Sequence, residues 1–294
     1  MPATAFGTDA LHIETDGPAT APPLLLLHGW GSNARLMRPL AKAFSDAYRV
    51  CTVDLPGHGH SPPPPEPWGV PDHADLVAAL IETEMDGGPV TIIGHSNGGR
   101  IALYMASTPA YAALIDRLVL VSPSGITPQR PLGTRLRAGV AQTLKAPFEH
   151  LPAPLRDPAL DWLRHSLLWR ALGSSDYNAL SGVMRQTFVK TVNHHLDEQV
   201  HRISVPTLLF WGDRDTAISR RQMQMLEDAI DDAGLDQLEE QAVHVLEDLG
   251  FLDADADQPG HAEEAAVADR VALRAPVRQP PGLPGMERAE GVGI

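Results

Sequence analysis

Residues 90–98 read VTIIGHSNG, and this stretch decides how the rest of the chain is interpreted. Its first four residues have the composition of a buried strand, and residues 98–107 have the spacing of a helix. Between them, Ser96 is the centre of a G-x-S-x-G motif, which turns the chain sharply and lifts the serine hydroxyl clear of the sheet. Gly94 and Gly98 are needed because a side chain there would collide with the neighbouring strand and helix. We therefore predict that Ser96 is a nucleophile.

The alternation of strands and helices continues on both sides of this motif. We expect strands at Leu24–His28, Tyr48–Leu55, Val90–Gly94, Leu118–Val121, Val205–Trp211 and Ala242–Leu246. Helical spacing is found at Ala34–Phe44, Asp72–Glu84, Gly98–Ser107 and Ser219–Ile230. Apolar strands separated by helices predict an α/β fold, with a mostly parallel central sheet and helices on both faces.

The alternation of strands and helices stops after Ser124. This interruption is the basis of the expected domain organisation. Residues 125–203 contain helical segments such as Leu160–Leu172 and Met184–Val200 but no clear strand. We expect residues 1–124 and 204–274 to form one core, residues 125–203 a helical cap over its ligand-binding edge, and residues 275–294 a disordered tail. The aromatic residues of the cap either line a substrate pocket or pack inside the cap: Trp162, Trp169, Tyr177 and Phe188.

Bulk composition narrows the class of protein. The net charge of −14 argues against a nucleic acid or an anionic membrane as partner. No apolar run approaches the roughly 18 residues of a membrane span, and the first residues lack the pattern of a signal peptide. Cys51 is the only cysteine, so no intrachain disulfide can form and a cytoplasmic location is expected. The acidic, lysine-poor composition fits either a GC-rich genome or a high-salt habitat.

Three further blocks accompany the serine motif: HGWGS at residues 28–32, DLPGHGHS at 54–61 and PTLLFWGDRD at 206–215. With these four blocks the chain resembles the serine-nucleophile α/β-hydrolases, in the branch of cap-bearing carboxylesterases and carbon–carbon bond hydrolases. The resemblance runs from about Leu24 to Gly250. It implies an α/β-hydrolase fold and a serine hydrolase that cleaves a small carboxylic ester or related acyl compound through an acyl-enzyme on Ser96. The implied chemistry needs no cofactor and no metal.

The resemblance also implies roles for individual residues. The backbone amides of Trp30 and Asn97 would form the oxyanion hole, and Asp215 would be the acid of a catalytic triad. Asp213, two residues earlier, is the alternative acid, but we expect it to fix the turn through an Asx-type bond. The histidines of the first two blocks are expected to be structural: His28, His58 and His60.

The catalytic base is where the chain departs from the family pattern. The family ends its last strand with a Gly-His pair, whereas Phe251 follows Gly250 here. Three alternatives remain open: His261 is the base, His244 is the base, or no base exists and the protein is a catalytically impaired module that binds a ligand or a protein. The adjacent pair His194-His195 lacks the spacing of a helical zinc site, and the sequence has no phosphate-binding or dinucleotide-binding motif.

Overall fold

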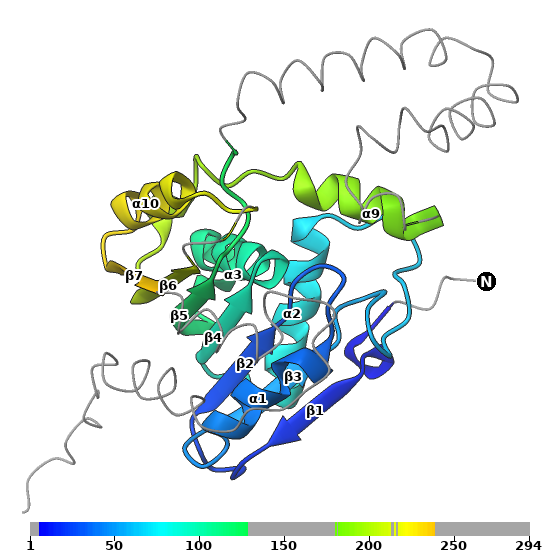
Figure 1. The fold of residues 1–294 in the computed structure, drawn as a ribbon. Coiled ribbons are helices and arrows are strands. Elements are labelled where there is room, and N and C mark those ends of the chain that lie inside the picture. The colour runs from blue at the N-terminus through cyan, green and yellow to red at the C-terminus, as the bar shows by residue number, and fades with distance from the viewer. Residues whose placement is uncertain (1–5, 129–179, 181, 213–214, 216, 239–294) are drawn as a thin grey trace, which may run out of the picture.

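The computed structural model describes residues 6–128, 180, 182–212, 215 and 217–238. Within these residues, seven strands form one sheet in the order β1-β3-β2-β4-β5-β6-β7 (Figure 1). Their bounds are β1 Ile13–Asp16, β2 Pro23–Leu27, β3 Arg49–Val53, β4 Val90–His95, β5 Ile115–Val121, β6 Thr207–Gly212 and β7 Ala233–Leu238. Only the pairing of β1 with β3 is antiparallel. The predicted fold class, a mostly parallel sheet in an α/β fold, is confirmed.

Helices cover both faces of the sheet, as predicted. Their bounds are α1 Ala34–Phe44, α2 Val70–Glu84, α3 Asn97–Ser107, α4 Pro109–Ala112, α9 Gly182–Val192 and α10 Arg220–Ala229, with short 3-10 helices at Thr8–Ala10 and Val200–Arg202. Successive side chains of a strand point to opposite faces. Leu25 and Leu27 of β2 therefore join the core beneath α2, α3 and α10, whereas Leu24 and Leu26 pack with α1. The sheet thus lies between two apolar layers.

Side-chain caps explain where two of these helices begin. The Asn33 side chain accepts a hydrogen bond of 3.1 Å from Arg35 N at the start of α1. At α10, Ser219 and Gln222 form a reciprocal capping box. Such caps satisfy amides that have no partner within the helix.

Two strands and two helices differ from the sequence-based prediction. The sequence does not predict the short helix α4. The prediction missed β1 and β7, both of which lie at the ends of the described sheet. The helix expected at Met184–Val200 ends at Val192, where the Asn193 side-chain amide donates to Val189 O at 2.9 Å. A short 3-10 helix follows at Val200–Arg202.

Other predictions fall on residues that the structure does not describe. They are the strand Ala242–Leu246, the helical segment Leu160–Leu172, the aromatic residues Trp162, Trp169 and Tyr177, and the tail 275–294. The cap 125–203 is described only at its two ends, so its boundaries stay a prediction. Among the described helices, none is long and apolar enough to cross a bilayer.

Candidate active site

Ser96 occupies the bend between β4 and α3, where the sequence places it. Its backbone dihedrals are φ 48° and ψ −106°, a left-handed conformation that non-glycine residues rarely adopt. Ser96 N donates to Val121 O at 3.1 Å, and Ser96 O accepts from Ser124 N at 3.0 Å. The residue is partly exposed. The end of β5 and the residues that follow it therefore hold the bend in place, with Ser96 partly exposed.

The glycines of the motif are required by close packing. A Cβ atom at Gly94 would lie 2.8 Å from Gly99 Cα, and one at Gly98 would lie 2.2 Å from Leu27 O. These are backbone atoms, which cannot move aside without separating α3 from β2 and β4. The steric reason predicted for Gly94 and Gly98 is the one that the structure shows.

The loop after β2 lies directly against this bend. A Cβ atom at Gly29 would be 3.3 Å from Ser96 Cβ, so the backbone that leads into Trp30 passes beside the serine. Within the described part of the chain, the backbone amides of Trp30 and Asn97 have no hydrogen-bond acceptor recorded. The Gly29–Trp30 loop thus passes beside Ser96, and Asn97 follows the serine directly at the start of α3.

Asp215 follows β6 in a turn that fixes its carboxylate. Asp215 Oδ1 accepts hydrogen bonds from Ala217 N at 2.8 Å and Ile218 N at 2.9 Å. The turn is held further by Trp211 Nε1, which donates to Ile218 O at 2.9 Å. Asp215 therefore makes the Asx-type bonds that we expected of Asp213, which lies outside the described residues. Its second oxygen, Oδ2, has no partner recorded among the described residues.

An electrostatic effect on His95 relates Asp215 to the bend. Burial lowers the pKa of His95 to about 4, and the Asp215 carboxylate partly opposes this effect. Strands β2, β4 and β6 run parallel in the sheet, and Trp30, Ser96 and Asp215 follow their carboxyl ends. The strand directions therefore place these three residues at the same edge of the sheet.

Comparison with known proteins identifies the family of this chain. A sequence profile of the alpha/beta hydrolase fold matches residues 22–250. The chain belongs to the α/β hydrolase fold family. It is 27% identical to an uncharacterized protein of Mycobacterium tuberculosis, over 92% of this chain and 83% of that protein. It is 30% identical to the pimeloyl-[acyl-carrier protein] methyl ester esterase of Chromobacterium violaceum, over 76% of this chain and 87% of that enzyme.

A solved structure shows the same fold. The enol-lactonase of Burkholderia xenovorans LB400 superposes with a TM-score of 0.58 and 22% identity, over 82% of this α/β hydrolase and 96% of the lactonase. At this identity the likeness concerns the fold alone.

His28 braces the loops of this α/β hydrolase. Its Nε2 accepts from Leu55 N at 2.9 Å, and its Nδ1 lies 2.7 Å from Gly29 O, a spacing that requires the proton on Nδ1. Burial, followed by the nearby His58, lowers its pKa to about 4, so the ring is neutral. Both ring nitrogens are engaged with the backbone, as expected of a structural histidine.

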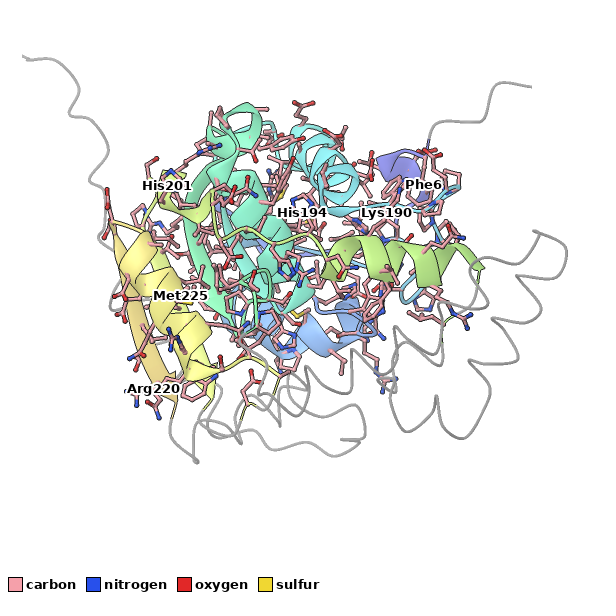
Figure 2. All side chains as sticks on the ribbon, turned by 90° about the horizontal axis from the view of Figure 1, so that it is seen from above. Phe6, Lys190, His194, His201, Arg220 and Met225 are labelled. Carbon is pink, nitrogen blue, oxygen red and sulfur yellow. The ribbon has the colours of Figure 1, made fainter. Side chains whose placement is uncertain are left out.

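Helix α9, which lies within the residues predicted to form a cap, reaches the same loop. The Trp30 ring makes edge contacts with His58 at 4.9 Å and with Phe188 of α9 at 5.0 Å, measured between ring centroids. Lys190 Nζ donates to Pro67 O at 2.6 Å, which attaches α9 to the proline-rich loop. Viewed from above, α9 extends across this end of the molecule, with Lys190 on its exposed side (Figure 2). Phe188 therefore packs against the loop that would form the oxyanion hole.

Neither candidate base is described, since His244 and His261 both lie beyond Leu238. The last described strand is β7, Ala233–Leu238, which pairs with β6 and precedes both histidines. The catalytic residues of this fold follow the chain order serine, acid, histidine. Both His244 and His261 come after Asp215 and after β7, so both satisfy this order. The choice between the two stays a prediction.

Sequence reasoning missed several residues that support the site. Val121, Ser124 and Trp211 hold the serine bend and the Asp215 turn through backbone or carbonyl bonds. It also missed a group formed by His12, Asp54 and His60, whose ligand atoms lie within 4.8 Å of one another. Asp54 and His60 belong to the block DLPGHGHS, but no pattern in the sequence links them to His12.

Proposed function

We propose that this α/β hydrolase cleaves a small carboxylic ester or related acyl compound through an acyl-enzyme on Ser96. The observation that carries the proposal is the strained backbone of Ser96 beside the Gly29–Trp30 loop. Strained backbone that surrounding hydrogen bonds maintain is often found at functional sites, and Ser96 is partly exposed. The ester bond is favoured because relatives are named as a methyl ester esterase and a lipase.

In the proposed reaction, a histidine removes the proton of Ser96 Oγ as the oxygen attacks the substrate carbonyl. The amides of Trp30 and Asn97 donate to the oxyanion, each contributing about 3 kcal/mol to transition-state stabilisation. The histidine returns its proton to the leaving alcohol, and water then releases the acid from Ser96 by the same route. His261 or His244 would be this histidine, and Asp215 Oδ2 would accept from its ring. We propose a small-molecule substrate and a cytoplasmic location.

The test is labelling by a fluorophosphonate probe together with hydrolysis of p-nitrophenyl acetate and butyrate. We expect Ser96→Ala to abolish labelling and to lower kcat by about 10³-fold or more, because the nucleophile is lost. Ser45→Ala is the matched control, since the Ser45 hydroxyl bonds within its own turn at the end of α1. Labelling that survives in Ser96→Ala would contradict the proposal.

The base can be assigned with the same assays. Replacing the true base by alanine should lower kcat by about 10³-fold or more, whereas alanine at the other histidine should leave it close to wild type. We therefore expect a large loss in one of His261→Ala and His244→Ala, and not in both. Equal activity of both variants with wild type would exclude these two histidines.

The alternative is a catalytically silent binding module. It is favoured by Phe251 in place of the family histidine and by the profile match, which ends at residue 250. A wild-type protein that is folded, unlabelled by the probe and inactive on both esters would support this alternative and contradict the hydrolase proposal.

A further inference from the structure

Two segments that are distant in sequence meet at the end of the β1–β3 pair. His12 precedes β1, Asp54 follows β3, and His60 lies in the loop 54–61. Backbone bonds fix their relation: Asp54 N donates to His12 O at 3.0 Å, His12 N donates to Ser61 Oγ at 2.9 Å, and Ser61 Oγ donates to Asp54 O at 2.6 Å. The positions of these residues are thus determined by the backbone.

The Asp54 carboxylate is held at the base of this group. Its side chain is 2% exposed, and its oxygens accept from Ala34 N at 2.6 Å and from His60 N at 2.8 Å. A Cβ atom at Gly59 would lie 2.1 Å from Asp54 Oδ2, so the loop can wrap around the carboxylate only with glycine there. One buried carboxylate is therefore presented, in a fixed orientation, beneath two imidazole rings.

The rings of His12 and His60 lie close together and are tilted by 55° relative to each other. The ring centroids of His12 and His60 are 4.7 Å apart, and His60 Nδ1 lies 3.6 Å from Asp54 Oδ2, too far for a hydrogen bond. His12 is oriented by Glu14, whose Oε1 lies 3.1 Å from His12 Nε2. The His60 side chain is 82% exposed and can turn toward the carboxylate without disturbing the core.

We propose that His12, Asp54 and His60 form a binding site for a zinc ion. One ligand atom from each residue lies within 4.8 Å of the other two. Around a tetrahedral zinc with bonds of about 2 Å the ligand atoms are about 3.4 Å apart, so the ligand atoms would have to move closer together, the exposed His60 ring by rotating. A set of two imidazoles and one carboxylate favours zinc, because calcium and magnesium bind mainly oxygen ligands. Water would complete the fourth position, and Glu14 would orient His12 as an outer partner.

Zinc bound there would join β1 to the loop 54–61. This loop carries His58, which contacts the Trp30 ring, and Asp54, which accepts from Ala34 N at the start of α1. Because an ion that binds only the folded state stabilises it, zinc should raise the melting temperature. The site is separate from Ser96, so the inference is independent of the hydrolase proposal.

The test is isothermal titration of the full-length protein with Zn²⁺, after removal of any affinity tag and of bound metal. We expect one ion per chain, an affinity at least about tenfold weaker in His60→Ala and in His12→Ala, and a zinc-dependent rise in melting temperature that both variants lose. His201→Ala, an exposed histidine on the 3-10 helix Val200–Arg202, is the matched control and should bind as wild type does.

Two results would overturn the proposal. One is zinc binding by His60→Ala with the affinity and stoichiometry of wild type. The other is loss of binding in His195→Ala instead, which would place the ion near the exposed polar residues around His195. The zinc-dependent rise in melting temperature should persist in Ser96→Ala. The zinc proposal can therefore fail or succeed independently of the proposal that Ser96 is a nucleophile.

Discussion

At the scale of single residues, hydrogen bonds to backbone groups hold two parts of the site in place: the strained backbone of Ser96 and the carboxylate of Asp215. The left-handed conformation of Ser96 costs about 1–3 kcal/mol, and it persists because Val121 and Ser124 bind its backbone on both sides. Asp215 is held in a similar way by two amides on one oxygen. This leaves Oδ2 of Asp215 as the oxygen that could orient a histidine.

Asp215→Asn separates the charge of this residue from its structural role. Asparagine keeps an oxygen that can accept from Ala217 N and Ile218 N, so the turn should persist and the melting temperature should change little. The loss of the negative charge should lower kcat on p-nitrophenyl acetate by about 10³- to 10⁴-fold, because a protonated histidine is no longer stabilised.

Asp231→Asn, at an exposed aspartate before β7, is the control for this variant. Should Asp215→Asn keep its rate within about tenfold of wild type while staying folded, Asp215 is not the acid of the triad.

At the scale of elements, the decisive contact is the close approach of α3 to β2 and β4. Glycines at both sides of Ser96 allow the first turn of α3 to lie directly on the strand backbones. This proximity places the start of α3 and the Gly29–Trp30 loop on either side of the serine. The arrangement of backbone donors at the site is therefore a consequence of helix–sheet packing.

Gly98→Ala tests this packing. The new methyl group would lie 2.2 Å from Leu27 O, so α3 must move away from β2. We expect a loss of about 1–3 kcal/mol in the free energy of unfolding, measured by urea denaturation, together with loss of esterase activity.

Gly88→Ala is the matched control, since a Cβ atom there meets nothing within 4 Å. Its stability and activity should equal those of wild type. If Gly98→Ala were as stable and as active as Gly88→Ala, the close approach would not matter to the site.

At the scale of the whole molecule, the fold buries several histidines as neutral rings. Burial lowers the pKa of His28 and of His95 to about 4, and it also lowers the pKa of His58 and His73. The unfolded chain, with histidine pKa values near 6.5, binds these protons first as the pH falls. Stability should therefore decline as the pH falls from about 6.5 to about 4.

The free energy of unfolding, measured by urea denaturation at about pH 7, 6 and 5, should show this decline, with each buried histidine contributing up to about 1.4 kcal/mol per pH unit. His73→Asn should make the dependence shallower, because the amide can still donate to Gly69 O but binds no proton. A wild-type protein equally stable at all three pH values would contradict the assignment of neutral buried histidines.

The strands that the sequence revealed differ physically from those it did not. The inner strands β2, β4, β5 and β6 are buried on both faces and read as apolar runs. By contrast, β1 and β7 read IETD and AGLDQL, and each has a neighbour on only one side in the described sheet. Such strands bury less surface, so their pairing leaves little hydrophobic pattern in the sequence.

The sequence alone determined the features that arise between neighbours along the chain. The bend at Ser96, its glycines and the capped start of α10 each depend on a few consecutive residues, whose sterics and hydrogen bonds are local. Only the tertiary structure decided which distant segments meet: the Gly29 loop beside Ser96, Phe188 against Trp30, and His12 with Asp54 and His60. These contacts depend on the order of the strands in the sheet and on how the helices pack against it. Neither can be deduced from the separation of residues along the chain.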